Sequence, residues 1–244
     1  SGYRFLTVSI LFKQLLQKDL ENEQNIGLLL PSTAAGAFIN NAVLMMGKTA
    51  VNLNYTSEID SIKAAIKSAD IKTIVESKKF VEKLEQKGIN ISEVFDLVNV
   101  IFVEDLKEKI SRPKGIFTYF SIKFLPNILL KAMHLCKTKK DDTAVILFSS
   151  GSEGTPKGVM LSGDNILGNS QQIAAVINAS DDDTIIGSLP LFHAFGIVVT
   201  TYLPLIEGIK CVAHPDPTDG FGLGKLVSKY KATIMCEIST LFRL

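Results

Sequence analysis

The sequence predicts an α/β protein with mainly parallel sheets that carry helices on both faces. Two observations predict it: short apolar runs alternate with segments of helical spacing from residue 26 onward, and 46% of the 244 residues are hydrophobic. Strands that alternate with helices imply right-handed crossover connections, which bring parallel strands side by side. A chain with this much apolar surface buries a core and is not disordered.

The expected elements follow one another along the chain. Ser57 is expected to cap a helix in which Ile59, Ile62 and Ile66 form one apolar stripe, because residues three, four and seven apart share a helix face. The pattern also predicts strands at 26–30, 50–53, 71–75, 98–103, 143–148, 185–189, 209–213 and 233–236, and helices at 34–46 (ending near Gly47) and 77–86 (closed by Gly88). We expect two subdomains, about residues 26–142 and 143–244.

Charge and cysteine content exclude several classes of function. The chain has 26 basic and 25 acidic side chains, so no whole-molecule field attracts a polyanion, and nucleic acid is disfavoured as a partner. Cys136, Cys211 and Cys236 lack the paired spacing of a zinc site or redox pair. We expect free, buried thiols in a reducing, cytoplasmic setting.

Three segments require a membrane check. The uncharged runs 24–47 and 184–206 exceed the roughly 20 residues that span a bilayer, but both contain proline and polar groups that favour a strand-turn-helix in a water-soluble core.

The chain begins with Ser1 and Gly2 in place of an initiator methionine and shows no signal-peptide pattern, so we expect a cut boundary there.

The third segment, residues 116–135, combines apolar and aromatic residues with lysines. Two interpretations stand: a basic amphipathic helix in a lipid interface, or a helical excursion packed on its own domain. Pro126 is expected to kink or break the helix in either case.

A loop rich in glycine and hydroxyl groups follows the strand 143–148. It reads S-S-G-S-E-G-T-P-K-G from Ser149 to Gly158, so backbone N–H groups, hydroxyls and the ammonium of Lys157 converge on one place. Phosphate is the natural ligand of such a set, and strand ends are where open α/β sheets bind ligands. The loop lacks the G-x-x-x-x-G-K-[ST] order of a Walker A loop, and no G-x-G-x-x-G opens a helix.

This loop resembles the phosphate-binding loop of the adenylate-forming superfamily, which includes acyl-CoA and acyl-carrier-protein synthetases, luciferases and peptide-synthetase adenylation domains. The resemblance implies the N-terminal part of that enzyme fold, with ATP and Mg²⁺ as cofactors and Lys157 as a catalytic residue. Glu153 stands where many members carry threonine. The residues that the resemblance assigns to the ATP phosphates are Ser149, Ser150, Gly151, Ser152, Glu153, Gly154, Thr155 and Lys157.

A second stretch, L-P-L-F-H-A-F-G from Leu189 to Gly196, also resembles the superfamily. There this segment lies beside the substrate carboxylate and the acyl pocket. The resemblance implies that His193 acts as a gate, as a catalytic and substrate-binding residue, and that Phe192 and Gly196 contact substrate.

Shorter stretches resemble one branch of the superfamily. They are residues 54–56, 71–74 and 103–107 together with the S-G-S-E-G variant, and they are similar to the acyl-acyl-carrier-protein synthetase part of bacterial 2-acylglycerophosphoethanolamine acyltransferases. This branch implies activation of a fatty acid to acyl-AMP, transfer to acyl-carrier protein, and re-acylation of a lysophospholipid by a protein at the bacterial inner membrane.

Two alternatives remain open: a long-chain acyl-CoA ligase, and a non-catalytic lipid- or nucleotide-binding module. The superfamily's Y-G-x-T-E motif, ribose-binding aspartate and C-terminal lysine are not found in the 244 residues. We therefore expect a fragment that shows no pyrophosphate exchange by itself.

Overall fold

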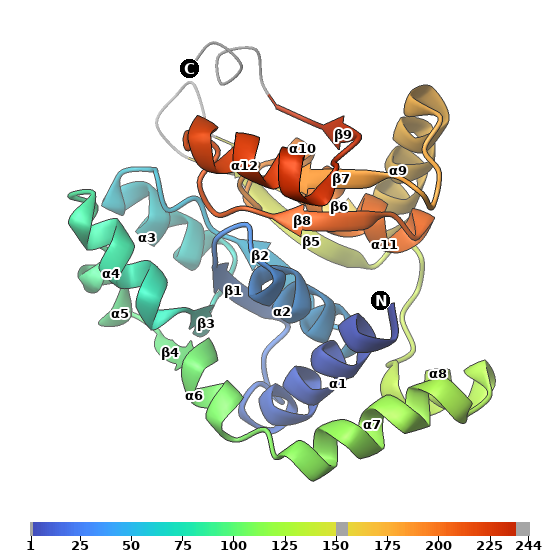
Figure 1. Cartoon of the computed structure of the whole chain (residues 1–244). Coiled ribbons are helices and arrows are strands. Elements are labelled where there is room, and N and C mark those ends of the chain that lie inside the picture. Colours follow the sequence, from blue (N-terminus) through green and yellow to red (C-terminus); the bar gives the residue numbers. More distant parts are fainter. Residues whose placement is uncertain (1, 150–155, 238–244) are drawn as a thin grey trace. The chain divides into compact units, whose positions relative to one another are not determined.

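The computed structural model describes residues 2–149 and 156–237, and their contacts divide them into two units. Residues 2–30, 38–149 and 156–161 form the first unit, and residues 31–37 and 162–237 form the second. Figure 1 labels the elements of both units. The predicted α/β class with mainly parallel sheets is confirmed, since every strand pair whose direction is given is parallel.

The first unit contains a six-stranded sheet in the order β4-β3-β1-β2-β5-β6. β1 lies between β3 and β2, and four of its five side chains are buried, which is typical of a parallel strand covered on both faces. The strands are β1 (Asn25–Leu29), β2 (Thr49–Asn52), β3 (Thr73–Glu76), β4 (Asn99–Phe102), β5 (Thr143–Ser149) and β6 (Lys157–Ser162). The helices are α1 (Gly2–Asp19), α2 (Ala34–Met45), α3 (Ile59–Ser68), α4 (Lys78–Gln86), α5 (Ser92–Phe95), α6 (Val103–Glu108), α7 (Arg112–Phe124) and α8 (Asn127–His134).

The second unit is built on a three-stranded parallel sheet in the order β8-β7-β9. Its core gathers Ile185, Leu189, Val199, Leu203 and Ile209. A capping box, in which Ser162 and Asn165 bond each other's backbone N–H, fixes the start of α9. The elements are α9 (Gly163–Ile177), β7 (Thr184–Gly187), α10 (Ala194–Ile197), the π-helix η1 (Val198–Tyr202), α11 (Leu203–Glu207), β8 (Lys210–Ala213), α12 (Gly220–Tyr230) and β9 (Ile234–Met235).

The predicted strands all occur, with bounds within about two residues of those expected. Gly47 and Gly88, predicted to end helices, have φ angles of 72° and 78°. The expected subdomain boundary near residue 142 differs from the observed division after Leu161. The reason is pairing: β5 is parallel to β2 and therefore extends the first sheet.

Two sequence predictions are wrong. Ser57 does not cap α3, which begins at Ile59 with Glu58 as N-cap and no side-chain capping bond. The three cysteines form no disulfide, as expected, but Cys136 and Cys211 are exposed and Cys236 is only half-buried. Cys211 lies in β8, whose residues are mostly exposed, and Cys136 and Cys236 follow the ends of α8 and β9.

Residues 116–135 pack on their own unit in part. They form the end of α7, a break at Pro126, and α8, so the predicted break at Pro126 is confirmed. α7 packs against α1 through buried Thr118 and Ile122, whereas α8 has no buried residue. No helix among the described residues is long and apolar enough to cross a membrane.

Candidate functional site

The predicted phosphate loop is anchored on two neighbouring strands of the first sheet. Ser149 is the last residue of β5, and Lys157 is the first residue of β6. The Ser149 hydroxyl lies 3.5 Å from the carbonyl oxygen of Lys157, and the ring of Phe148 lies against Gly158. The side chains of Ser149 and Lys157 are both exposed. The two ends of the loop are therefore held together, and their polar groups face solvent.

The strand order brings a second segment to the same place. β2 is the parallel neighbour of β5, with Asn52 in register with Leu147, so both strands end at the same edge of the sheet. The chain leaves β2 and runs from Asn54 to Ser61 into the start of α3. Carboxyl edges of parallel strands are the usual ligand sites of open α/β sheets.

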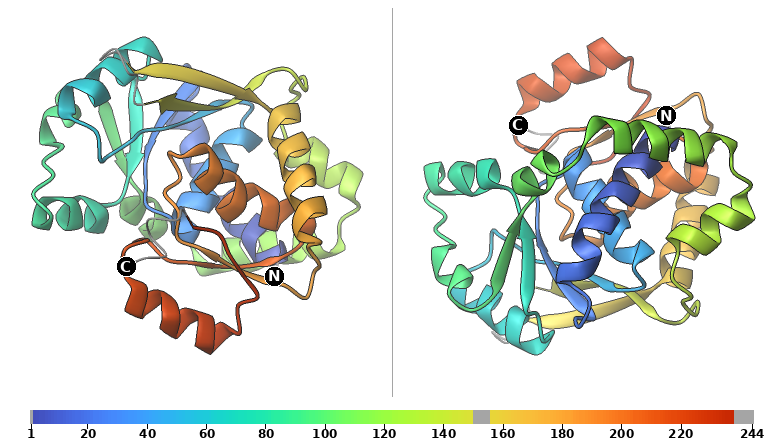
Figure 2. Two further views of the ribbon diagram at one scale, coloured as in Figure 1. Left: turned by 90° about the horizontal axis from the view of Figure 1, so that it is seen from above. Right: turned by 90° about the horizontal axis from the view of Figure 1, so that it is seen from below.

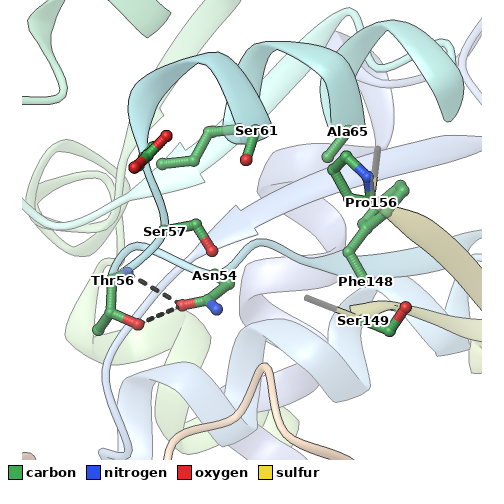
Figure 3. Close-up of a pocket in the computed structure, with 10 residues that line it drawn as sticks. Asn54, Thr56, Ser57, Ser61, Ala65, Phe148, Ser149 and Pro156 are labelled. Atoms are coloured by element: carbon green, nitrogen blue, oxygen red, sulfur yellow. Dashed lines mark hydrogen bonds between the residues drawn. The ribbon is translucent and has the colours of Figure 1, made fainter. Parts of the chain in front are cut away.

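A cavity of ≈ 470 Å³ lies at this edge. Figure 3 shows Asn54, Thr56, Ser57 and Ser61 on one side, and Phe148, Ser149 and Pro156 on the other. Its volume falls within the range of about 300–1,000 Å³ that small-molecule sites occupy. The lining residues are Asn54, Thr56, Ser57, Glu58, Ser61, Ile62, Ala65, Phe148, Ser149 and Pro156.

The polar side chains of this cavity are mainly oxygen donors and acceptors. The Asn54 Oδ1 atom accepts hydrogen bonds from the Thr56 backbone N–H (3.0 Å) and hydroxyl (2.7 Å), which fixes the turn after β2 (Figure 3). The hydroxyls of Ser57, Ser61 and Ser149 add donors that suit phosphate oxygens. Such a lining fits a polar, oxygen-rich ligand.

Most residues predicted for the phosphate loop lie outside the described residues: Ser150, Gly151, Ser152, Glu153, Gly154 and Thr155. Of the described ones, Ser149 lines the cavity, and Lys157 is not among the lining residues. The structure therefore attaches both ends of the predicted loop to the edge that carries the cavity.

A buried carboxylate stands at the end of another strand of this sheet. Glu76, the last residue of β3, is fully buried, and neither of its carboxylate oxygens has a hydrogen-bond partner among the described residues. Burial, with a contribution from the nearby Glu104, raises the pKa of Glu76 to about 8. Glu104 itself accepts hydrogen bonds from the Ser77 hydroxyl (2.7 Å) and the Lys78 backbone N–H (3.0 Å). Glu76 is therefore neutral near pH 7.

The second predicted segment lies in the second unit, after β7. Phe192 is buried with 4% of its surface exposed, and the centroid of its ring lies 4.5 Å from that of the partly exposed His193. His193 precedes α10, and its carbonyl accepts a hydrogen bond from the Ile197 backbone N–H (2.9 Å). Partial burial lowers the pKa of His193, so the neutral imidazole is the main form at pH 7. A neutral ring both donates and accepts one hydrogen bond.

Gly196 has a packing role in the same segment. A Cβ atom at this position would lie 2.1 Å from the carbonyl oxygen of Pro190, which is far inside van der Waals contact. Only glycine allows α10 to approach the backbone of Pro190 this closely.

Polar groups at the carboxyl edge of the second sheet bond one another. The Ser188 hydroxyl donates to the carboxylate of Glu237, and the Ser32 hydroxyl donates to the carbonyl of Leu189. His214 Nε2 lies 3.3 Å from Asp219 Oδ2. Burial raises the pKa of Glu237.

Sequence reasoning missed the role of residues 54–61 as a cavity wall. Nothing in that stretch resembles a ligand-binding pattern by itself, and its place follows from β2 and β5 being neighbours. The available signal is the cluster of hydroxyl residues directly after a buried strand, in which the sequence analysis interprets Ser57 as a helix cap and residues 54–56 as a branch resemblance.

Together, the parallel sheets and the cavity at a carboxyl edge define an α/β protein with a candidate small-molecule site. A family model described as "AMP-binding enzyme" matches residues 9–244. The chain therefore belongs to the AMP-binding enzyme family.

Relatives of the chain include acid–CoA ligases. The chain is 28% identical over 224 residues to the probable 4-coumarate–CoA ligase 2 of Dictyostelium discoideum, covering 86% of this chain and 39% of the relative. It is 23% identical over 245 residues to the long-chain-fatty-acid–CoA ligase of Yersinia pestis, covering 91% and 43%. The chain thus spans about two fifths of the length of these relatives.

Solved structures of the same fold include o-succinylbenzoate coenzyme A synthetase (MenE) from Bacillus subtilis in complex with ATP and magnesium ion. It superposes with a TM-score of 0.76 at 18% identity, over 98% of this chain and 57% of that one. The predicted resemblance to the N-terminal part of an adenylate-forming fold is confirmed.

Proposed function

We propose that the protein takes part in ATP-dependent activation of a fatty acid to an acyl-adenylate. The observation that carries the proposal is the cavity at the carboxyl edge of β2 and β5, to which both ends of the loop S-S-G-S-E-G-T-P-K-G are attached. Family membership and the long-chain-fatty-acid–CoA ligase among the relatives support it.

In this reaction a carboxylate oxygen attacks the α-phosphorus of ATP, and the bond from that phosphorus to the pyrophosphate oxygen breaks. The protein's contribution is positioning and charge neutralisation. In our assignment, Ser149 and the other loop residues, Ser150 to Thr155, form hydrogen bonds to the phosphates. Lys157 neutralises the charge of the phosphates. We assign contact with the acid to the segment that contains His193, Phe192 and Gly196.

Mg²⁺ accompanies ATP in such reactions and neutralises phosphate charge. The described residues contain no group of three or more His, Cys, Asp or Glu side chains that would hold a metal ion alone. The cavity offers hydroxyl, amide and carboxylate oxygens, among them Ser149 and Glu58. This donor set fits Mg²⁺, which keeps several water ligands and takes few protein ligands when it is bound to the phosphates of a nucleotide.

The acceptor that we propose is acyl-carrier protein, with a lysophospholipid such as 2-acylglycerophosphoethanolamine as the final acyl acceptor. Residues 54–56, 71–74 and 103–107 and the S-G-S-E-G variant support this finer proposal. The alternative acceptor is CoA, and the CoA ligases among the relatives favour it.

Binding of ATP tests the first step. Lys157→Ala is expected to weaken the binding of a fluorescent ATP analogue with Mg²⁺ by about 10- to 100-fold, because a hydrogen bond to a charged group contributes about 1.5–3 kcal/mol. The matched control is Lys210→Ala: Lys210 is also exposed and also begins a strand, β8, in the other unit. Equal loss in the two variants, or binding unaffected by Lys157→Ala, would overturn the assignment of the loop.

Product analysis tests the acid and the acceptor. The chain, and any natural extension of it, is supplied with ATP, Mg²⁺ and palmitate, and acyl-adenylate, acyl-CoA and acyl-carrier-protein thioester are measured. Acyl transfer to carrier protein in preference to CoA supports the finer proposal, whereas acyl-CoA as the main product favours the alternative. ATP binding without any acyl-adenylate in the extended protein would favour a non-catalytic nucleotide-binding module.

A further inference from the structure

The helices α7 and α8 expose a continuous series of large apolar side chains. Phe117, Phe124 and Ile128 have 74%, 70% and 77% of their surface exposed. Solvent-exposed apolar residues are ordinary when scattered but indicate an interaction surface when they cluster. We name as the α7–α8 surface the exposed residues Ile116, Phe117, Phe120, Phe124, Ile128, Leu129, Met133 and Leu135.

The exposed side of α7 is opposite its packed side. At about 100° per residue, Ile116, Phe117, Phe120 and Phe124 fall within one arc of about 100°. The buried Thr118 and Ile122 fall on the other side, where α7 packs against α1 (Figure 1). The Phe120 and Phe124 rings are stacked, with centroids 5.9 Å apart. The apolar arc of α7 is therefore separate from the side chains with which the helix packs on its own unit.

α8 is held in place without burying any of its side chains. The buried Lys13 of α1 donates a hydrogen bond from Nζ to the carbonyl of His134 at the end of α8 (2.8 Å). The Cys136 backbone N–H bonds the Met45 carbonyl (3.2 Å). The view from below in Figure 2 shows no other element of the first unit in front of α7 and α8. The helix is thus fixed at its end while Ile128, Leu129 and Met133 stay exposed to solvent.

The charged residues within the stretch that carries this surface, between Glu108 and Asp141, have one sign. Residues 109–140 contain eight basic side chains and no carboxylate, although the chain as a whole has 26 basic and 25 acidic ones. The remaining residues therefore carry 18 basic against 25 acidic side chains. Lys123 Nζ lies 5.6 Å from the centroid of the Phe124 ring, at the border of the apolar arc. The basic residues are Lys109, Arg112, Lys114, Lys123, Lys131, Lys137, Lys139 and Lys140.

We propose that the α7–α8 surface binds the interface of an anionic lipid bilayer. Aromatic and aliphatic side chains enter the boundary of headgroups and acyl chains, while the flanking lysines contact anionic headgroups. Neither helix is long enough to span, so the helices lie along the surface. A symmetric contact between two copies is disfavoured because it places cations against cations. This proposal does not depend on the proposed function.

The absence of tryptophan allows a direct experiment. Phe124→Trp gives the chain a single tryptophan on the α7–α8 surface. Its emission is expected to shift to the blue on addition of phosphatidylglycerol–phosphatidylcholine vesicles, much less with phosphatidylcholine alone, and to return at high salt because surface charges are then screened. The matched control is Phe221→Trp in α12: Phe221 is 76% exposed and has Lys225 Nζ 4.0 Å from its ring centroid.

Charge variants distinguish the contribution of the lysines of the α7–α8 surface to vesicle binding from the contribution of the net charge. Lys114, Lys123 and Lys131 changed together to glutamine are expected to weaken vesicle binding by more than tenfold, since each cation near an anionic surface contributes about fivefold. The control changes the exposed Lys67, Lys79 and Lys83 to glutamine, which alters net charge equally. Its expected loss is less than threefold.

Three results would overturn the proposal. They are equal binding to neutral and anionic vesicles, an equal blue shift in the Phe124→Trp and Phe221→Trp variants, and concentration-dependent self-association without lipid that Phe124→Ser abolishes. The last result would identify a second copy of the chain as the occupant.

Discussion

The carboxyl edges of the two sheets differ in how their polar groups are used. At the first sheet, hydroxyls of Ser57, Ser61 and Ser149 surround a cavity of ≈ 470 Å³, and the buried Glu76 at the end of β3 has no partner among the described residues. At the second sheet, Ser188 bonds Glu237 and Ser32 bonds the Leu189 carbonyl. The first edge therefore presents three hydroxyls to a cavity, which suits it to binding a ligand. At the second edge the hydroxyls of Ser188 and Ser32 are bonded within the protein, although one carboxylate oxygen of Glu237 there also has no partner among the described residues.

The largest effect is expected at the second edge, from Gly196→Ala. The new Cβ would lie 2.1 Å from the Pro190 carbonyl oxygen, so α10 has to move, at a cost of about 3 kcal/mol or more. Denaturant unfolding measures this loss. The control Gly168→Ala, inside α9 with nothing within 4 Å of the added Cβ, is expected to stabilise the protein by about 0.5–1 kcal/mol. Equal effects of the two substitutions would show that the close approach at Pro190 does not matter.

At the first edge, Glu76→Gln is expected to have an effect that grows with pH. The pKa of about 8 in the fold lies above the ordinary value of 4.5, so the folded protein holds a proton that the unfolded chain releases. Wild-type stability therefore falls between pH 4.5 and 8, by at most about 1.4 kcal/mol per pH unit, and glutamine removes this dependence.

The measurement compares the free energy of unfolding of both proteins at pH 5 and pH 8. The advantage of the glutamine variant should be larger at pH 8. A difference that is the same at both pH values would contradict the neutral, buried state of Glu76.

A smaller effect is expected from Ser188→Ala. The substitution removes the hydroxyl that bonds Glu237 and leaves that partly buried carboxyl without a donor, which costs about 1–3 kcal/mol. Ser57→Ala at the first edge is the counterpart, since the Ser57 hydroxyl lines the cavity, and it is expected to change stability by less than about 0.5 kcal/mol. Thermal or denaturant unfolding measures the free energy of unfolding of both variants. An equal loss of stability in Ser57→Ala and Ser188→Ala would contradict the difference between the two edges.

The sequence predicted much of this fold because every residue of β2, β3 and β7 is buried. β6, whose residues are mostly exposed, is not among the predicted strands. β1 lies in the apolar run from Ile26 to Leu30, which marks a strand with little ambiguity, whereas β3 also contains the polar Thr73 and Glu76. The order of the strands in the sheet was not predictable, because an apolar run does not indicate which other strand it pairs with. β5 was therefore assigned to the wrong side of the expected boundary near residue 142, although it pairs with β2.

The candidate site was predictable only in part, for the same reason. The loop after β5 carries its chemistry in consecutive residues, so it could be found from sequence. The wall formed by residues 54–61 depends on β2 lying next to β5, and the burial of Glu76 depends on packing around β3. Ser57 illustrates the limit: its position before a helix suggested a cap, whereas in the fold it lines the cavity.

Hydrogen–deuterium exchange with and without ATP and Mg²⁺ tests the central claim most directly, because it reports on both edges in one experiment. If the first edge binds the nucleotide phosphates, ATP slows exchange in residues 54–61 and 157–162 more than in residues 188–197 and 210–222. Protection that is confined to the second set, or no protection at ATP concentrations that saturate binding, would contradict the account.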